Sequence, residues 1–338
     1  MDYKLSVIFI TYNHAPYVEK ALRSILAQET DFPFEVVIGD DHSTDGTGEI
    51  LRTIADEYPP HEAKGCGDRQ IRLYVREENT GKRPTLNVYE TTKRCNGDYL
   101  AYLEGDDYWT DPLKLQKQVD ILDRHPKYMA VTHSLQMVDE AGDSITDPDV
   151  LQVGSLYDWD GVYTYNDFCY SKKWPGHYAS VVSRNIYKEE KYDYTILYRA
   201  SDFTDDAMIL LFLLMQGDIY RMSDVMSAWR YVKKSGGSNW NSIALRRDIA
   251  RDDCYMSRKV MQWIEQYRQL GPYSKKRCLD DFGLALKEYL RRPDSTNKAF
   301  LKDMYEYGIT HVVMQDKKTS LPGFAVRFVL NRIGLVKI

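Results

Sequence analysis

The chain has 338 residues and a formal net charge of −5, which excludes the strongly basic surface of a typical nucleic-acid-binding protein. Its 43% hydrophobic residues suffice for one large domain or one domain plus a smaller one. Five scattered cysteines without a CxxC pair argue against a zinc site or a disulfide framework and for a reducing compartment. The N-terminal apolar segment is too short for a signal peptide and the run 207–215 too short for a membrane span, so we expect a cytoplasmic protein.

Apolar, β-branched runs alternate with amphipathic stretches in the N-terminal part of the chain. Strands are predicted at 5–10, 35–39, 71–75 and 99–103, and helices at 16–28, 47–58 and 83–95. This alternation is typical of βαβ units, in which successive strands are parallel and helices cross over between them. The sequence therefore predicts an α/β fold with a doubly wound, mostly parallel sheet flanked by helices.

Three polar loops, 11–14, 40–45 and 104–107, follow strands of this predicted sheet. The carboxyl ends of parallel strands share one edge, where open α/β sheets bind their ligands. Asp106 and Asp107 are adjacent carboxylates that repel each other, which suits a hard cation such as Mg²⁺ or Mn²⁺ between or beside them. A helix N-terminus also favours negative charge, so the two residues taken alone leave the choice open.

The other aspartates of these loops have structural explanations as well. Asp41 can accept a hydrogen bond from a ring N–H or a ribose hydroxyl, or it can cap a turn. Asp45 and Asp111 fit the N-terminal turn of the helix that follows each of them. The chain has neither a GxGxxG nor a P-loop motif, so nucleotide phosphates would need a metal, basic side chains such as Lys82 or Arg83, or both.

Taken together, these motifs resemble the family 2 glycosyltransferases with the GT-A fold. The family has a T/S-Y-N loop, a D-D-x-S-x-D-G-T loop and a DxD metal motif in this order. The matching segments are SVIFITYNHAPYVEKALRSILAQ, EVVIGDDHSTDGT and NTGKRPTLNVYETTKRCNGDYLAYLEGDDYWTDPLKL. They cover the first third of the chain, and their combined order and spacing are more specific than any one of them.

The resemblance assigns roles to six of the loop residues. It implies a nucleotide-base pocket lined by Thr11, Tyr12 and Asn13. Asp41 would hydrogen-bond the base, Asp106 would contact the ribose or the sugar, and Asp107 would ligate the metal. The chain departs from the family at Glu104, where Asp is frequent, and at His42, where Gly or Asn is common and where the change could alter the base pocket.

The signal is weaker after the acidic motif. The predicted elements are a helix at 113–122 and strands at 128–138 and 178–183. Residues 140–175 show little periodicity and are expected to form loops around an acceptor groove. Trp174 suits stacking on the apolar face of an acceptor sugar, or packing within a solvated loop. His177 and Trp240 complete the candidate acceptor residues.

An acidic stretch, 201–206, precedes a very apolar helix that ends before Gly217. Acidic residues at a helix N-terminus are favoured by the helix dipole, so this pattern has a purely structural explanation. An inverting glycosyl transfer also needs a carboxylate that takes the proton of the attacking hydroxyl. By the resemblance, Asp206 falls on the catalytic base of the family, with Asp205 its neighbour and Asp202 an outside candidate.

The segments after this helix resemble the end of the family's catalytic domain. Arg230 is expected to face the diphosphate, and 235–240 to form a Gly-rich loop over the donor. Beyond it, the composition predicts helices at 241–270, 274–291 and 296–307, a region suited to dimerisation or acceptor handling. Residues 323–338 form an apolar stripe with basic rims, which suits either an anionic membrane surface or the protein's own core.

We therefore expect a GT-A catalytic domain at 1–240, with a nucleotide-sugar half at 1–110 and an acceptor half at 111–240, and a helical region at 241–338. The resemblance implies a Mg²⁺- or Mn²⁺-dependent inverting transferase that moves one sugar from a nucleotide-diphospho-sugar, UDP-linked by preference, to a glycan or lipid-linked glycan. Two rivals remain. A sugar-nucleotide pyrophosphorylase would need a Gly-rich, Arg–Lys loop after the first strand, where this chain has the loop 11–14 instead. A non-catalytic sugar- or nucleotide-binding protein would tolerate loss of Asp206.

Overall fold

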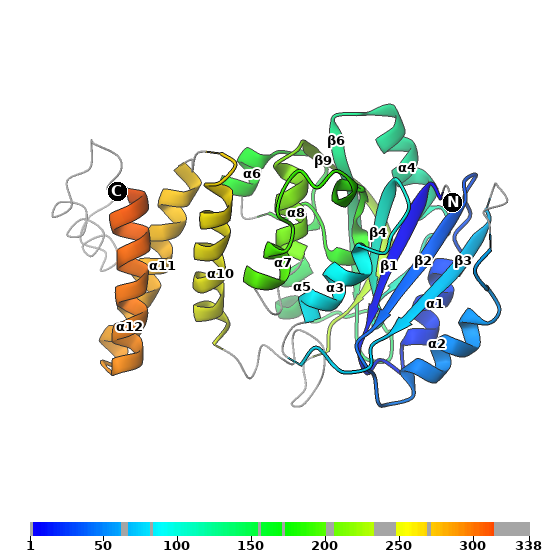
Figure 1. Cartoon of the computed structure of the whole chain (residues 1–338), viewed down its shortest axis with the longest axis horizontal. Helices are drawn as coiled ribbons and strands as arrows, with labels where there is room; N and C mark the ends of the chain where they lie inside the picture. Colours follow the sequence, from blue (N-terminus) through cyan, green and yellow to red (C-terminus); the bar gives the residue numbers. More distant parts are fainter. Residues whose placement is uncertain are drawn as a thin grey trace. The chain divides into compact units, whose positions relative to one another are not determined.

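The structure is a computed structural model that divides into two compact units, Met1–Arg247 and Asp248–Ile338 (Figure 1). The residues that it describes are 3–61, 67–81, 84–154, 157–170, 173–200, 206–232, 248–268 and 272–313. Each of the two units has its own buried hydrophobic cluster.

The first unit begins with four parallel strands, as the sequence predicts. They are β1 (Leu5–Thr11), β2 (Phe34–Asp40), β3 (Arg69–Val75) and β4 (Tyr99–Glu104), and they lie in the order β3-β2-β1-β4. All residues of β1 and β2 are buried, which explains their near-continuous apolar sequences. The loops that follow β1, β2 and β4 therefore leave the sheet at one edge.

Helices connect these strands and cover both faces of the sheet. They are α1 (Val18–Leu26), α2 (Thr47–Ala55) and α3 (Pro84–Thr92). The first two crossovers run in one direction along the sheet and the third runs back, so right-handed connections place α1 and α2 on one face and α3 on the other (Figure 1). Helix α2 starts where it does because the Asp45 carboxylate accepts hydrogen bonds from the N–H and hydroxyl of Thr47.

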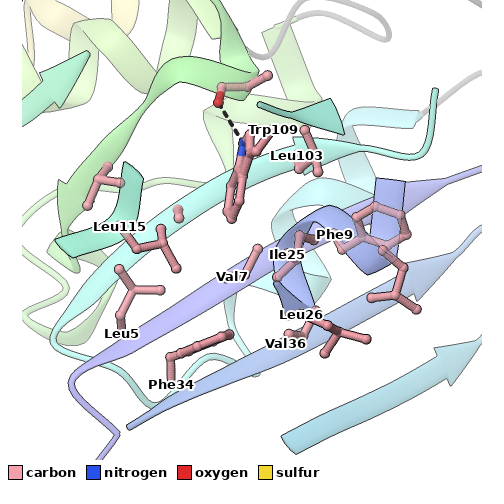
Figure 2. Packing of buried hydrophobic residues seen from close by; sticks show 14 of the residues in the cluster. Leu5, Val7, Phe9, Ile25, Leu26, Phe34, Val36, Leu103, Trp109 and Leu115 are labelled. Carbon is pink, nitrogen blue, oxygen red and sulfur yellow. Dashed lines mark hydrogen bonds between the residues drawn. The ribbon is translucent and has the colours of Figure 1, made fainter. Parts of the chain in front are cut away.

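One hydrophobic core fills the space between the sheet and the helices on the α1 face. Figure 2 shows Phe9 and Val36 of the strands packed against Ile25 of α1, with Trp109 above them. The Trp109 ring is buried, and its indole N–H donates to the carbonyl of Ala179 at 3.0 Å. That bond ties the segment after the acidic motif to a residue far along the chain.

The second half of this unit extends the same sheet. Its elements are β5 (Tyr108–Trp109), α4 (Lys114–Arg124), β6 (Tyr128–Val138), α5 (Pro148–Gly154), β7 (Gly161–Tyr163), α6 (Tyr165–Tyr170), β8 (Val182–Arg184), α7 (Ile196–Ala200), α8 (Asp206–Leu214) and β9 (Asp218–Arg230). The described strands form one mixed sheet in the order β3-β2-β1-β4-β8-β6-β9-β5, with β7 paired to β9. The α/β fold with a central sheet between helices is thus confirmed.

Strand β9 connects the second half of the sheet to the acidic motif. It runs parallel to β6, with register shifts that mark bulges, and then pairs antiparallel with β5. Tyr108 faces Ala228 in this pairing, so the end of β9 arrives beside the residues that follow β4. Two segments more than a hundred positions apart in the sequence therefore meet at the acidic motif.

Two predictions for this half are corrected. The segment 140–175 contains α5, β7 and α6 rather than loops throughout. The expected strand at 178–183 begins instead with a 3₁₀ turn, Tyr178–Ser180, and only Val182–Arg184 is a strand. The turn forms because His177 Nδ1 accepts a hydrogen bond from the N–H of Ala179, which an apolar pattern does not reveal.

The second unit is helical where the structure describes it. Its elements are α10 (Ile249–Ile264), α11 (Pro272–Arg291), α12 (Ser295–Met304) and a π-helical segment, Tyr305–Val313. Cys254, Ala285, Phe300 and Met304 form its core. None of the described helices in either unit combines the length and apolar character that a bilayer crossing demands.

Candidate active site

The acidic motif sits in a tight turn at the end of β4. The N–H of Gly105 donates to the carbonyl of Ile10, and the N–H of Asp107 donates to the carbonyl of Glu104. A Cβ atom at position 105 would lie 2.6 Å from Thr11 Oγ1 and 2.8 Å from His14 Nδ1. Glycine is required here because the turn packs directly against the loop after β1.

Asp107 has one oxygen bonded and one oxygen without a partner. Oδ1 accepts a 2.8 Å hydrogen bond from the backbone N–H of Arg230, whereas Oδ2 is buried with no hydrogen-bond partner among the described residues. Burial raises the pKa of Asp107 well above its usual range, and the negative charge of Asp106 adds to the effect. A buried carboxylate oxygen without a donor is the kind of ligand that Mg²⁺ or Mn²⁺ takes, so the residue fits a metal.

The surroundings of Asp106 add two further unpaired polar atoms. Asp106 Oδ2 lies 3.9 Å from His14 Nε2. His14 Nδ1 and Thr11 Oγ1 are both buried and, within the described part of the chain, have no hydrogen-bond partner. Unpaired buried polar atoms are rare in folded proteins, and these two lie around Gly105, in the same turn as Asp107 with its unpaired Oδ2. This concentration indicates a place where a polar ligand completes the hydrogen bonding.

Arg230 reaches the same turn from the end of β9 and is itself buried. Its guanidinium donates to the carbonyls of Asp106 at 2.9 Å, Asp139 at 2.8 Å and Glu140 at 2.7 Å. Its charge also lies 4.5 Å from the ring centre of Tyr17. These contacts make Arg230 a clamp between the acidic turn and the 139–140 turn, so its guanidinium is engaged with backbone rather than held out toward a ligand.

The loops after β1 and β2 are joined to each other. Asn13 has φ +55°, its N–H donates to Ser43 Oγ, and its side-chain oxygen accepts from the N–H of Thr44. Tyr12 is 37% exposed at the surface of this junction. The junction leaves Tyr12 as the accessible ring and gives Asn13 a structural role in fixing the loop.

The Asp41 carboxylate is buried and already hydrogen-bonded within the protein. It accepts from the N–H and hydroxyl of Thr80 and from the side-chain amide of Asn79. Arg76 Nε lies 3.5 Å away. Burial raises the pKa of Asp41 and these bonds oppose the rise. A nucleotide base that bound Asp41 would have to share the carboxylate oxygens with the donors of Thr80 and Asn79. The sequence did not indicate these internal hydrogen bonds.

Asp206 is the first residue of α8, and its Oδ1 accepts from the N–H of Ala207. Burial raises the pKa of its carboxyl group. The helix behind it, Met208–Leu214, is buried on all sides, so the position of its N-terminus is fixed by packing. Burial, and after it the negative charge of Asp206, raises the pKa of the Tyr157 phenol.

His177 lies beside the acidic turn, whereas Trp174 does not. His177 Nδ1 is 3.8 Å from Asp107 Oδ2, and burial lowers the pKa of the imidazole to about 4. Its ring stacks on Trp229, with 4.8 Å between the centroids. Trp174 packs edge-on against Phe168 of α6, which fits the packing alternative left open by the sequence. The remaining candidates lie outside the described residues: Lys82, Arg83, Asp202, Asp205 and Trp240.

Comparison with known proteins identifies a similarity in the first part of the chain. Residues 6–146 match the family model described as glycosyl transferase family 2. This segment is therefore similar to glycosyl transferase family 2. The predicted resemblance is confirmed, and the matched segment contains β1 to β6 with all three polar loops.

Curated relatives match about two fifths of the chain or less. An uncharacterized protein of Mycobacterium tuberculosis is 41% identical over 138 residues, which are 41% of this chain and 37% of that protein. TuaG of Bacillus subtilis, named provisionally as a teichuronic acid biosynthesis glycosyltransferase, is 34% identical over 118 residues, or 35% of this chain and 41% of its own. The chain thus spans less than half the length of these curated relatives.

Among solved structures, TarS of S. aureus in complex with UDP-GlcNAc matches with a TM-score of 0.58 at 16% identity, covering 89% of this chain and 79% of that one. At this identity the likeness concerns the fold, and it confirms the expected GT-A type architecture.

Three residues of the site were missed from the sequence. His14 directly follows the Thr-Tyr-Asn loop, so its neighbours were a signal that could have found it. Trp229 precedes Arg230 on β9, where strand alternation turns the two side chains to opposite faces. Tyr157 lies in a stretch without periodicity, and nothing in its local sequence points to the site.

Proposed function

We propose that this protein is a metal-dependent inverting glycosyltransferase that moves one sugar from a nucleotide-diphospho-sugar to a hydroxyl of an acceptor glycan. The observation that carries the proposal is the pair of carboxylates at the two ends of one site. Asp107 presents an unpaired oxygen at the edge where β1, β2 and β4 end and lies 3.8 Å from His177; Tyr157 packs on His177 and interacts electrostatically with Asp206. Such a pair suits a donor held at one end and a base at the other.

The reaction follows from these positions. An oxygen of the acceptor hydroxyl attacks the anomeric carbon and forms the new C–O bond, while the bond from that carbon to the diphosphate oxygen breaks. The hydroxyl proton passes to Asp206, and the nucleoside diphosphate leaves with the electron pair. Attack from the side opposite the leaving group inverts the anomeric configuration. Burial raises the pKa of Asp206 toward that of a better base.

Asp107 would hold the divalent metal, whose positive charge would neutralise the diphosphate. Within the described residues no three His, Cys, Asp or Glu side chains make a closed metal cage. An open site of one or two carboxylates is what Mg²⁺ and Mn²⁺ use when substrate phosphates supply the other ligands. Lys82 and Arg83 remain proposed phosphate contacts.

A UDP-linked donor fits the UDP-GlcNAc complex of TarS, and a role in surface-polysaccharide synthesis fits the name of TuaG. A lipid-linked glycan acceptor is proposed from the amphipathic segment 323–338, which lies outside the described residues. Binding to vesicles that contain anionic lipid, lost on deletion of 323–338, would support that acceptor; unchanged binding after the deletion would count against it.

The deciding experiment is calorimetric titration with UDP, GDP and dTDP, each with and without Mn²⁺. We expect one nucleotide to bind in a Mn²⁺-dependent manner, and Asp107→Ala to abolish that binding. Asp111→Ala is the matched control, because its carboxylate lies in the same segment but is engaged with the N–H of Leu113 and with Lys117. If the wild type binds no nucleotide with or without metal, the proposed function is wrong.

A further inference from the structure

Three aromatic rings contact one another beside the acidic turn. We call these rings, Tyr157, His177 and Trp229, the aromatic row. His177 and Trp229 overlap with 4.8 Å between centroids and 34° between planes. Tyr157 meets both edge-on, with centroid distances of 6.1 Å to His177 and 6.5 Å to Trp229. Edge-on and offset contacts of this kind hold rings in fixed positions.

Each end of the aromatic row is next to one carboxylate. His177 Nδ1 is 3.8 Å from the unpaired Asp107 Oδ2. At the other end, Tyr157 is close enough to Asp206 to feel its charge. The aromatic row therefore begins beside the proposed metal ligand, and the ring at its other end interacts electrostatically with the proposed base.

In a displacement with inversion, the reacting carbon has to lie between the leaving diphosphate and the base. This inference rests on the proposed function, which puts the diphosphate at Asp107 and the base at Asp206. The sugar that carries the reacting carbon then lies alongside the aromatic row. Sugar rings have apolar C–H faces and polar rims, and aromatic side chains with polar tips complement both.

We infer that the aromatic row binds the transferred sugar, with Trp229 as the stacking face and His177 as a hydrogen-bond donor to a sugar hydroxyl. Trp229 is only partly buried, although its neighbours Ala228 and Arg230 on β9 are buried, so part of its ring remains available. His177 accepts from Ala179 through Nδ1, which leaves Nε2 as the protonated nitrogen of the neutral ring. The ring nitrogen that carries hydrogen is therefore the one not used in the turn.

The test separates the sugar from the nucleotide. Calorimetry compares, for each variant, the tightest-binding sugar nucleotide of a UDP-glucose, UDP-galactose and UDP-GlcNAc panel with UDP itself. Trp229→Ala should weaken binding of the sugar nucleotide by roughly three- to tenfold, because one stacked aromatic ring increases affinity by about that much. Binding of UDP should stay the same. Trp229→Phe, which keeps a flat ring, should recover most of the loss.

Trp159→Ala is the matched control. This tryptophan is also partly buried, but its ring contacts Tyr163 and Arg221 rather than the aromatic row. It should leave both affinities unchanged. If Trp229→Ala does not fold by circular dichroism, the graded pair Trp229→Phe and Trp229→Leu makes the same comparison.

Two results would overturn the inference while leaving the proposed function intact: equal losses for UDP and the sugar nucleotide, or no loss for either. A wild-type protein that binds none of UDP, GDP, dTDP and the sugar nucleotides of the panel would refute the proposed function and this inference with it.

Discussion

Replacing Arg230 by lysine tests how the acidic turn is held in place. The guanidinium donates to three backbone carbonyls, those of Asp106, Asp139 and Glu140. Lysine keeps the charge but has no planar fork that reaches all three acceptors. The lysine ammonium replaces two of these three hydrogen bonds and loses the third. Because a hydrogen bond to a charged group contributes about 1.5–3 kcal/mol, Arg230→Lys should lower the free energy of unfolding by about 2 kcal/mol.

The effect on binding should exceed this general loss of stability. Arg230 also fixes Asp107 through its backbone N–H, and a shifted turn would turn the unpaired Oδ2 away from its present position. Removing a residue that orients a metal ligand typically weakens metal binding by about 10- to 100-fold. We therefore expect Arg230→Lys to weaken the Mn²⁺-dependent part of UDP binding by about tenfold or more, and to leave UDP binding without metal unchanged.

Arg184→Lys provides a closely matched control. Arg184 donates to the carbonyls of Tyr128 and Leu122 and lies 5.7 Å from the ring centre of Tyr99, so it resembles Arg230 in its bonding but is not at the acidic turn. Urea unfolding should show similar losses of stability in both variants, and calorimetry should show a binding loss only in Arg230→Lys.

Two outcomes would refute this reasoning. Equal binding losses in both variants would mean that general loosening, not the orientation of Asp107, is responsible. A loss of metal-free UDP binding in Arg230→Lys would mean that the guanidinium contacts the diphosphate directly, which is the role first expected from the sequence.

Four further outcomes are expected. Asp206→Asn should lower the rate of sugar transfer by about 10²- to 10⁴-fold while nucleotide binding by calorimetry stays unchanged, and retained turnover would exclude Asp206 as the base. Because burial raises the pKa of Asp206 and only the carboxylate accepts a proton, kcat/KM should rise with pH along a limb that lies above the ordinary aspartate value of about 3.9; a limb at that value would contradict the burial argument. Gly105→Ala should lower the free energy of unfolding by about 1–3 kcal/mol and weaken Mn²⁺-dependent UDP binding. In the control variant Gly46→Ala the added Cβ would meet no atom within 4 Å, so only the backbone cost of its φ of +98° should appear. Burial raises the pKa of Asp281 to about 6, so the folded state binds the proton more tightly than the unfolded chain, and stability should fall as pH rises from about 4 to 6; Asp281→Asn should flatten that slope in urea unfolding.

The parallel half of the fold could be predicted because its signals are local. Strands buried on both faces have continuous apolar sequences, and α1 and α2 have one apolar stripe each. The hydrogen bond from the N–H of Thr47 to the Asp45 carboxylate could likewise be predicted, because it joins residues only two positions apart. The predicted boundaries of these elements consequently fall close to those in the structure.

The second half was harder to predict where its elements are short, as in α5, β7, α6 and β8, and are stabilised by contacts between distant segments. Helix α6 did have a local signal: the hydroxyl of Thr164 accepts from the N–H of Asp167, and the carboxylate of Asp167 accepts from the N–H of Thr164. The 3₁₀ turn at Tyr178 had none, because an apolar buried segment reads as a strand whichever way its backbone turns.

Asp107 combines a local signal, which the sequence shows, with a long-range contact, which it does not. The sequence singled out the carboxylate, but its orientation depends on a hydrogen bond from Arg230, 123 positions away, which pairing of β5 with β9 brings into place. The match to the family covers residues 6–146 and so contains the carboxylate without the segments that orient it. Trp229, His177 and Tyr157 also lie beyond that match. The proposed metal ligand therefore lies inside the segment that matches the family, whereas Arg230, which orients it, and the aromatic row lie outside that segment.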